Sequence, residues 1–348
     1  MSSRIYYADV LRVTATISVV VLHTTAPILY KFSSIDRSWW WIGNVVDSSC
    51  RWCIPIFIML SGMLLLDTSK SESSKLFFQK RFNKVIVPFV VWSILYSFWK
   101  TRWNFSYSIS GSISDFLTGD IYYHLWFFYP LIGVYILTPI LRCYTKNASS
   151  RTLTYFVILW LIATPFYNAI NQFPSLTVTT PLYFAIIVIA FLGYFFLGFL
   201  LNKRGIGHKR RRYIYVAALA GISITILGTY FLTKHADGVF QGYFYNYFSI
   251  NVIILSTAIF LTAKDTEWSK TLFKNAKASR FLDDFSSASL GIFLVHPLIL
   301  DILPVLRIES TTIHPAIGIP LVSVLTISIS FVLIRLLQRT PIIKRIVP

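Results

Sequence analysis

Long apolar segments alternate with short polar interruptions along the whole chain of 348 residues. A helix needs roughly 20 apolar residues to cross the hydrocarbon core of a bilayer, and the segments are about that long. They lie at roughly 8–30, 42–66, 85–100, 123–141, 153–171, 181–201, 214–232, 247–263, 287–303 and 315–335. The pattern predicts an all-α, polytopic bundle of about ten transmembrane helices, which forms a single membrane domain over residues 1–348.

The composition also indicates a membrane protein with little extramembrane mass. Hydrophobic residues make up 55% of the chain and charged residues 13%, and the mean hydropathy is +0.63. A soluble domain carries about 25% charged residues, which it needs to cover a surface that faces water. The 10 Trp and 20 Tyr residues are typical of the aromatic belts at both membrane interfaces. We therefore expect no separate soluble module.

The net charge of +18 indicates an orientation in the membrane rather than a nucleic-acid partner. Of the 32 Lys and Arg residues, 25 lie in the two terminal segments and in alternate segments between the predicted spans. Cytoplasmic loops are enriched in these residues, which also contact the anionic headgroups of the bilayer. The distribution predicts a multi-pass protein of the cytoplasmic membrane with both the N-terminus and the C-terminus in the cytoplasm.

The sequence indicates neither a disulfide framework nor a metal. Three cysteines are too few for such a framework, and the C-x-x-C of Cys50 and Cys53 lies inside an apolar span. The histidines within the spans lie on separate spans and lack the ligand spacing of a zinc motif. We expect no bound metal ion.

Ionisable side chains inside the spans are the first candidates for function, because they are costly in a bilayer and usually face a cavity. Arg12 and His23 are eleven residues apart, about three turns, and therefore lie on nearly the same face of the first span. Arg12 is expected near the cytoplasmic boundary, and His23 lies roughly 16 Å further along the axis. Alternatively, Arg12 snorkels to headgroups and His23 makes a hydrogen bond between packed helices.

Three more ionisable side chains are expected at about the same depth in the membrane as His23. His124 opens the fourth span, and His296 lies in the outer half of the ninth. Arg51 is a cation within the second span. It either forms a structural ion pair with Asp47, one turn earlier, or binds substrate. These residues extend the candidate site across three further spans.

Five segments, in their order along the chain, resemble the acyltransferase 3 family of integral membrane O-acyltransferases. They are Arg12 followed after ten residues by His23, Phe57-Ile-Met-Leu-Ser-Gly62, the basic run from Lys80 to Pro88, His124-Leu-Trp-Phe127, and Ser289-Leu-Gly-Ile-Phe-Leu-Val-His296. The chain is most similar to short, single-domain members that resemble the O-acetyltransferase of enterobacterial common antigen. Many members carry Arg-x-Arg before the third span, where Arg81 and Lys84 are the nearest match here.

The resemblance implies transfer of an acyl group, by default acetyl, from cytoplasmic acyl-coenzyme A to a sugar hydroxyl. The acceptor is expected to be a cell-envelope polysaccharide or its lipid-linked precursor. His23 is the expected general base for this hydroxyl, or alternatively a nucleophile that is transiently acylated. Arg12, Arg81 and Lys84 are expected to bind the phosphates of the co-substrate acetyl-CoA.

The remaining candidates are expected near the acceptor. His124 or His296, or Arg51, would stabilise the oxyanion or orient the sugar. Trp126 would stack on a sugar face, unless it belongs to the interfacial aromatic belt. The alternative to an enzyme is a transporter or flippase for an envelope lipid or glycan, which would use the same buried Arg and His groups to bind substrate or protons.

Overall fold

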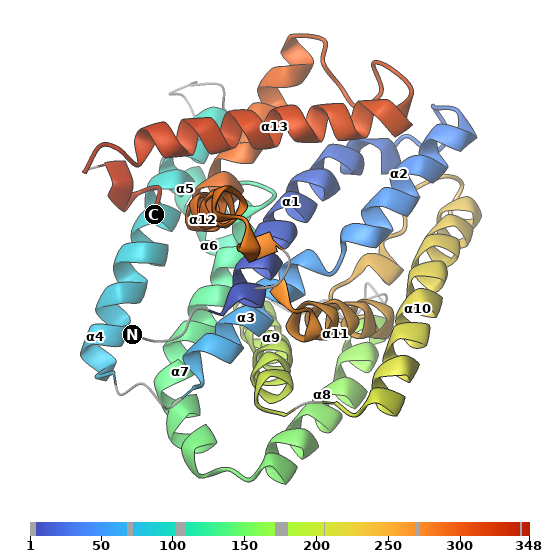
Figure 1. The fold of residues 1–348 in the computed structure, drawn as a ribbon. Helices are drawn as coiled ribbons and strands as arrows, with labels where there is room; N and C mark the ends of the chain where they lie inside the picture. The colour runs from blue at the N-terminus through green and yellow to red at the C-terminus, as the bar shows by residue number, and fades with distance from the viewer. Residues whose placement is uncertain are drawn as a thin grey trace.

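A computed structural model describes residues 5–67, 72–101, 109–170, 180–204, 206–268, 272–341 and 343–348. Within these ranges the secondary structure is helical throughout (Figure 1). The α-helices are α1 (Tyr6–Leu29), α2 (Arg37–Cys50), α3 (Cys53–Leu65), α4 (Ser74–Arg81), α5 (Val87–Lys100), α6 (Ile109–Thr118), α7 (Phe128–Asn147), α8 (Ser150–Ile170), α9 (Thr180–Lys203), α10 (His208–His235), α11 (Ile250–Asp265), α12 (Ala276–Val305) and α13 (Pro315–Leu337).

The helices confirm the predicted polytopic bundle. Nine helical stretches in the described ranges are long and apolar enough to cross a membrane. A shorter apolar helix at Ser150–Phe166 accounts for the predicted span at 153–171. Each of the ten predicted spans therefore coincides with a helical stretch. The short helix α6 has no counterpart among the predicted spans and lies between the third and the fourth.

Two of the spans are interrupted, which their apolar pattern does not indicate. Helix α2 ends at Cys50 and α3 begins at Cys53, so that Arg51 and Trp52 form a turn within the second span. Between α4 and α5 the chain forms one π-helical segment, Phe82–Ile86. There the N–H of Val87 bonds to the carbonyl of Phe82, five residues back, directly before a proline that has no N–H of its own.

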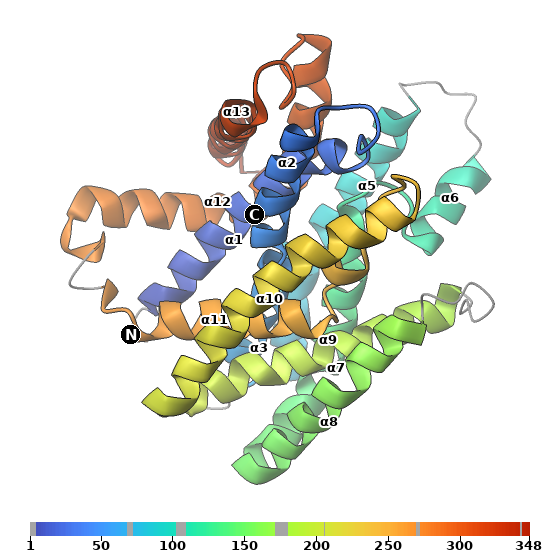
Figure 2. The same cartoon turned by 90° about the vertical axis from the view of Figure 1, so that its right-hand side faces the viewer.

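Helix α1 lies at the centre of the bundle. It packs against α2, α3, α11, α12 and α13, as Figures 1 and 2 show from two directions. Helix α3 packs closely on α9 because glycines face backbone atoms there. A Cβ on Gly62 would lie 1.8 Å from the carbonyl oxygen of Phe195, and one on Gly198 would lie 2.1 Å from that of Met59. Small residues at such positions allow two membrane helices to approach each other closely.

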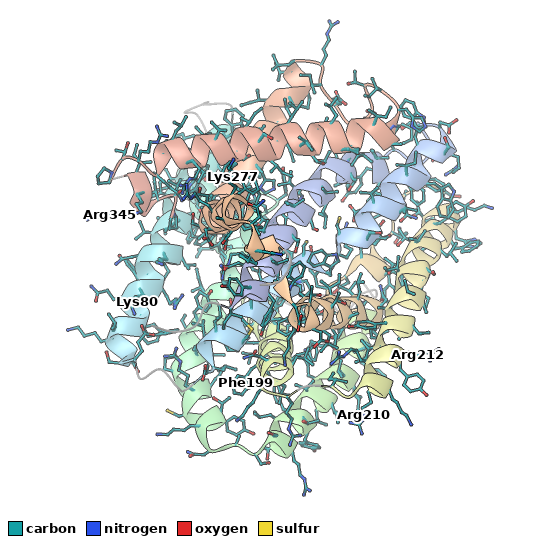
Figure 3. All side chains as sticks on the ribbon, viewed as in Figure 1. Lys80, Phe199, Arg210, Arg212, Lys277 and Arg345 are labelled. Carbon is teal, nitrogen blue, oxygen red and sulfur yellow. The ribbon has the colours of Figure 1, made fainter. Side chains whose placement is uncertain are left out.

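Segments that are predicted to lie on the cytoplasmic side contact one another. Arg211, at the start of α10, pairs with Asp265, at the end of α11, at 2.8 Å. The Lys264 ammonium donates to the carbonyl of Leu201, at the end of α9, at 2.5 Å. Arg210 and Arg212 are exposed and project away from the bundle (Figure 3). By the positive-inside rule, this is the face that we expect in the cytoplasm.

Candidate active site

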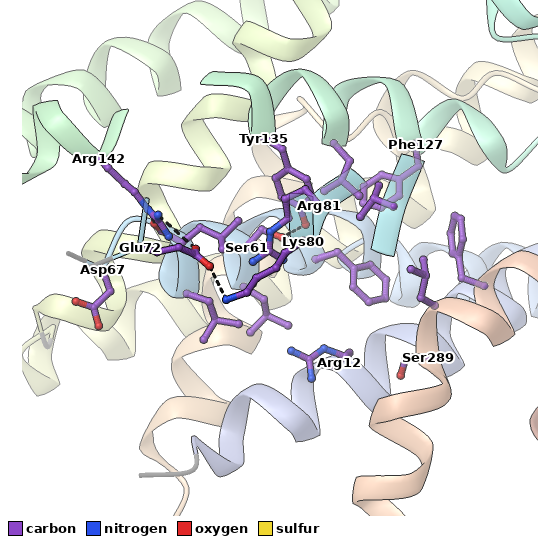
Figure 4. A pocket seen from close by; sticks show the side chains of 18 of the residues that line it. Arg12, Ser61, Asp67, Glu72, Lys80, Arg81, Phe127, Tyr135, Arg142 and Ser289 are labelled. Atoms are coloured by element: carbon purple, nitrogen blue, oxygen red, sulfur yellow. Dashed lines mark hydrogen bonds and ion pairs between the residues drawn. The ribbon is translucent and has the colours of Figure 1, made fainter. Parts of the chain in front are cut away.

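A cavity of about 560 Å³ lies between α1, α3, α4, α7 and α12. Its polar lining consists of Arg12, Ser61, Asp67, Glu72, Lys80, Arg81, Tyr135, Arg142 and Ser289. Figure 4 shows how these side chains from separate helices surround one space. We call it the basic cavity. Four of the lining residues are cations and two, Asp67 and Glu72, are acidic, so the cavity has an excess of positive charge and suits an anionic ligand.

Glu72 connects two of these cations. Its carboxylate accepts a hydrogen bond from Nζ of Lys80 at 2.6 Å and lies 3.7 Å from Nη1 of Arg142 (Figure 4). The hydrogen bond from Lys80 is the main cause that lowers the pKa of Glu72 below its ordinary value of 4.5. Glu72 is therefore ionised at neutral pH and holds the two cations at the cavity wall.

Arg81 forms no close ion pair with a carboxylate among the described residues, although its charge acts on Glu72. Its guanidinium carbon lies 5.3 Å from the ring centre of Phe77 and 5.6 Å from that of Tyr135. Its Nε is buried and has no hydrogen-bond partner in the described part of the chain. Leaving such a donor unsatisfied is unfavourable, so an anion in the cavity would stabilise this side chain.

Lys84, which the family resemblance pairs with Arg81, is exposed and does not line the basic cavity. In an uninterrupted α-helix, residues three apart lie on the same face. The π-helical segment begins at Phe82, between the two residues, and widens the helix there. The structure thus brings Arg81 to the cavity and turns Lys84 away from it, while Lys80 and Arg142 line it instead.

Arg12 lines the basic cavity from α1 and is fixed by partners within the protein. Its Nη1 donates to Oδ1 of Asp9 at 3.1 Å and to Oγ of Ser286, on α12, at 2.8 Å. About one third of the Arg12 side chain remains exposed. The guanidinium is therefore held at the cavity wall and does not simply extend toward headgroups, although it can still contact a ligand.

Three spans bring His23, His124 and His296 together. The ring centres of His23 and His296 are 5.3 Å apart, and those of His124 and His296 are 5.6 Å apart. His124 and His296 are buried, whereas His23 is partly accessible. We call these residues the histidine cluster. Their contact agrees with the similar depth predicted for them from the sequence.

A small cavity of about 20 Å³ lies against the histidine cluster. A space of this size holds about one water molecule. Its lining consists of Val19, Leu22, His23, Cys53, Ile54, His124, Trp126, Tyr247 and Phe293. We call it the histidine cavity. Two imidazoles therefore face a narrow space with mainly apolar and aromatic walls.

Beyond the cluster lies a third cavity, of about 440 Å³, which we call the outer cavity. It is lined by Tyr30, Arg51, Trp126, Ile187, Phe191, Phe240, Gly242, Tyr245, Asn246, Tyr247 and Phe248. Trp126 and Tyr247 stack with ring centres 5.7 Å apart and planes 22° apart. The cavity thus combines aromatic surfaces with one cationic side chain.

Arg51 forms the ion pair with Asp47 that its sequence position suggests, and it also lines a cavity where it could bind substrate. It forms an ion pair with the fully buried Asp47, to which its Nε donates at 2.5 Å. Asp47 also accepts a hydrogen bond from Thr25 at 3.0 Å. At the same time, the guanidinium lies 4.0 Å from the ring centre of Tyr245 and lines the outer cavity. It is a structural partner that remains available to a ligand.

The three cavities adjoin one another. Phe293 lines both the basic cavity and the histidine cavity. Trp126 and Tyr247 line both the histidine cavity and the outer cavity. These shared side chains stand between the cavities, so the histidine cluster lies between the basic cavity and the outer cavity.

Glu72 and Arg142 line the basic cavity although no sequence motif singles them out. In the sequence, nothing distinguishes Arg142 from the other cations that follow the fourth span. Glu72 is an acidic residue within the basic segment 70–84, and this difference in charge could have marked it as a candidate. Their contact joins the segment before α4 to the C-terminal half of α7, which periodicity along a single helix does not encode.

The fold and these cavities define a polytopic membrane protein in which buried histidines separate a basic cavity from an aromatic one. A family model described as an acyltransferase domain, that of the acyltransferase 3 family, matches residues 5–335. The chain belongs to this family and is a membrane acyltransferase. No curated protein and no solved structure matches the chain at a significant level.

Proposed function

We propose that the chain is an O-acetyltransferase of the cytoplasmic membrane. It would transfer an acetyl group from cytoplasmic acetyl-CoA to a sugar hydroxyl of a cell-envelope polysaccharide or its lipid-linked precursor. The observation that carries this proposal is the series of adjoining cavities with His23 in the middle one. Membership of the family supports acyl transfer in general.

The basic cavity is the proposed site for acetyl-CoA. The phosphates of this substrate are negatively charged, and Arg12, Arg81, Lys80 and Arg142 offer charge-assisted hydrogen bonds to them. The cavity volume of about 560 Å³ lies in the usual range for small-molecule sites. The acyl end of the substrate would then reach the histidine cluster when Phe293, which lines both cavities, turns aside, because the histidine cavity alone holds about one water molecule.

His23 is the proposed general base. A sugar hydroxyl is a weak nucleophile at neutral pH, and a neutral imidazole can take its proton as the oxygen attacks the thioester carbonyl. A C–O bond forms, the C–S bond breaks, and the proton on His23 passes to the departing thiolate. The products are the acetyl ester and free CoA, so that all atoms and charges balance.

His124 is the proposed donor to the oxyanion of the tetrahedral intermediate. Neither of its ring nitrogens makes a hydrogen bond of normal geometry in the described part of the chain, although the residue is buried and the carbonyl of Leu294 interacts with the ring. A neutral imidazole carries one N–H, which can serve the negative oxygen as it develops. The low polarity of the surrounding walls would strengthen that hydrogen bond.

The outer cavity is the proposed acceptor site. Its aromatic residues Trp126 and Tyr247 offer flat surfaces to a sugar ring, and Arg51 offers hydrogen bonds to hydroxyl groups. Because the buried Asp47 compensates the charge of Arg51, the site would not require an anionic sugar. It adjoins the cavity that contains His23, as transfer requires.

Release of free CoA from acetyl-CoA tests the proposal. Membranes that contain the protein and the native acceptor should release CoA in proportion to acetylated glycan. The His23→Ala variant should lose at least 100-fold in rate, as expected when a general base is removed. His235→Ala, an exposed histidine at the end of α10, is the matched control and should keep full activity. Full activity of His23→Ala would overturn the proposed mechanism.

The same assay separates the enzyme from the transporter that the buried charges would also allow. A transporter or flippase moves its substrate without consuming acetyl-CoA. Movement of a labelled glycan precursor in the absence of acetyl-CoA, with no acetylation when it is present, would favour the transporter. Family membership already favours the enzyme.

A further inference from the structure

The hydrogen bond of His296 to its own helix determines which ring nitrogen carries the proton. Nδ1 lies 3.1 Å from the carbonyl oxygen of Ile292, and the carbonyl of Phe293 also interacts with the ring. A carbonyl oxygen can only accept, so Nδ1 must donate. Pro297 has no N–H and leaves the carbonyl of Phe293 without its usual helical donor. The His-Pro sequence therefore leaves one of these two carbonyls, that of Phe293, free to support this tautomer.

The other nitrogen of His296 is consequently an acceptor. The residue is fully buried, and no carboxylate among the described residues forms an ion pair with it. A buried imidazolium without compensation is unfavourable, so the ring is neutral and Nε2 carries a lone pair. This atom has no hydrogen-bond partner in the described ranges. The histidine cluster thus contains a buried acceptor that needs a donor.

His23 is the neighbour best placed to supply that donor. Its ring centre is 5.3 Å from that of His296, and the two planes are 28° apart. The two rings are stacked, and the lone pair of an imidazole nitrogen lies in its ring plane. The His23 ring must therefore turn about its Cβ–Cγ bond to direct an N–H at Nε2 of His296. The ring of His124 is 5.6 Å away but turned by 74°, with an edge directed at a face.

We propose that His296 orients His23 by accepting a hydrogen bond from one of its ring nitrogens. The proposal rests on the function proposed above. It leaves the second nitrogen of His23 as a lone pair for the acceptor hydroxyl, and it stabilises the imidazolium that forms when that proton is taken. His296 itself stays neutral and exchanges no atom. It is a positioning residue, in the way that a third group orients the base in other catalytic triads.

The proposed role of His296 bears on which histidine stabilises the oxyanion, a role for which both His124 and His296 were candidates. A neutral His296 whose N–H is bound to its own helix has no donor left for an oxyanion. Of the two histidines considered for that role, His124 is the one without a hydrogen bond of normal geometry, although the carbonyl of Leu294 interacts with its ring. No hydrogen bond joins His23 and His296 in the structure as described. Hydrogen bonds of this kind are often poorly aligned before substrate binds and tighten in the reactive complex.

Two substitutions distinguish an acceptor from a packing residue. His296→Leu keeps an apolar side chain of similar size but removes the acceptor, whereas His296→Gln supplies a carbonyl oxygen. With acetyl-CoA and membranes that contain the native acceptor, His296→Leu should reduce kcat about 100-fold while the KM for acetyl-CoA stays within about twofold. His296→Gln should recover at least a tenth of the wild-type kcat. A purely structural role predicts no such rescue.

Three outcomes would overturn the inference: a kcat of His296→Leu near the wild-type value, a rise in the KM for acetyl-CoA in place of the loss in kcat, or a His296→Gln variant as inactive as His296→Leu. Size-exclusion chromatography in detergent verifies that each variant folds. If His296→Leu fails this check, His296→Asn replaces it. The Asn side chain is too short for its amide to reach His23, so this variant should be less active than His296→Gln. A wild-type protein that transfers no acetyl group would instead overturn the proposed function.

Discussion

The buried ionisable residues of the site differ in whether their polar atoms have hydrogen-bond partners within the protein. Asp47 and Arg51 form an ion pair that also stabilises the break between α2 and α3. By contrast, Nε of Arg81, both nitrogens of His124 and Nε2 of His296 are buried without a hydrogen bond of normal geometry in the described ranges. Unpaired buried polar atoms call for an explanation, which can be a catalytic role or a bound water or ion. Nε of Arg211, outside the three cavities, is a further example. Arg81, His124 and His296 lie at the basic cavity and the histidine cluster, where substrate atoms would satisfy them.

Removing Arg81 should weaken the binding of acetyl-CoA more than it slows the chemistry. Loss of a hydrogen bond to a charged group costs about 1.5–3 kcal/mol, so Arg81→Ala should raise the KM for acetyl-CoA about 10-fold to 100-fold. Arg81→Lys should fall in between, because it keeps the charge but not the forked geometry. Lys75→Ala removes an exposed cation on the same helix and should leave the KM unchanged. An equal effect of both alanine variants would contradict a specific role for Arg81.

Removing the charge of Glu72 should strengthen donor binding. In Glu72→Gln, Lys80 and Arg142 no longer pair with a carboxylate and become available to phosphates, so the KM for acetyl-CoA should fall severalfold. Steady-state kinetics at several acetyl-CoA concentrations measure this change. A rise in the KM would show instead that Glu72 is needed to position the two cations.

The lowered pKa of Glu72 determines how the difference in KM between wild type and Glu72→Gln depends on pH. Its ion pairs are present above the ordinary value of 4.5 and are lost only as the pH falls through the lower value in the folded protein. From about pH 5 to pH 8 the carboxylate stays ionised, so the difference in KM between wild type and Glu72→Gln should remain constant. A difference that disappears between about pH 6 and pH 7 would require another titrating group.

At the scale of helices, the interruptions position the site. The turn at Arg51 and Trp52 brings a cation to the outer cavity, and the π-helical segment at Phe82–Ile86 separates Arg81 from Lys84. The apolar pattern predicts both spans but neither break, because a change of backbone hydrogen bonding leaves the spacing of apolar residues almost unaltered. Only Pro88, which cannot continue the helical hydrogen bonds, marks the second of them.

The close contact of α3 and α9 predicts a large effect of a single methyl group. In Gly62→Ala the new Cβ would lie 1.8 Å from a backbone carbonyl oxygen, so the helices must move apart. Overpacking of this kind costs about 1–3 kcal/mol, and the unfolding temperature in detergent should fall by several degrees. Gly207→Ala, whose Cβ would meet no atom within 4 Å, is the control and should change little. Equal unfolding temperatures would show that the contact does not stabilise the bundle.

For the whole molecule, local pattern and tertiary packing explain different parts of the structure. The number and order of the spans follow from apolar length, and the spacing of Arg12 and His23 follows from helical periodicity. The meeting of His23 with His296 joins residues 273 positions apart, and no periodicity within one span specifies it. The same holds for Glu72 and Arg142. The positions of the histidines within the apolar spans singled them out, whereas the composition of the basic cavity required the packed structure.

The most direct test of the account is the mass of the envelope glycans from cells that lack the gene and carry a wild-type, His23→Ala or His235→Ala copy. We expect glycans heavier by one acetyl group per modified unit with the wild type and with His235→Ala, and unmodified glycans with His23→Ala at equal protein level. Acetylated glycans with His23→Ala, or no mass difference between cells with and without the wild-type gene, would contradict it.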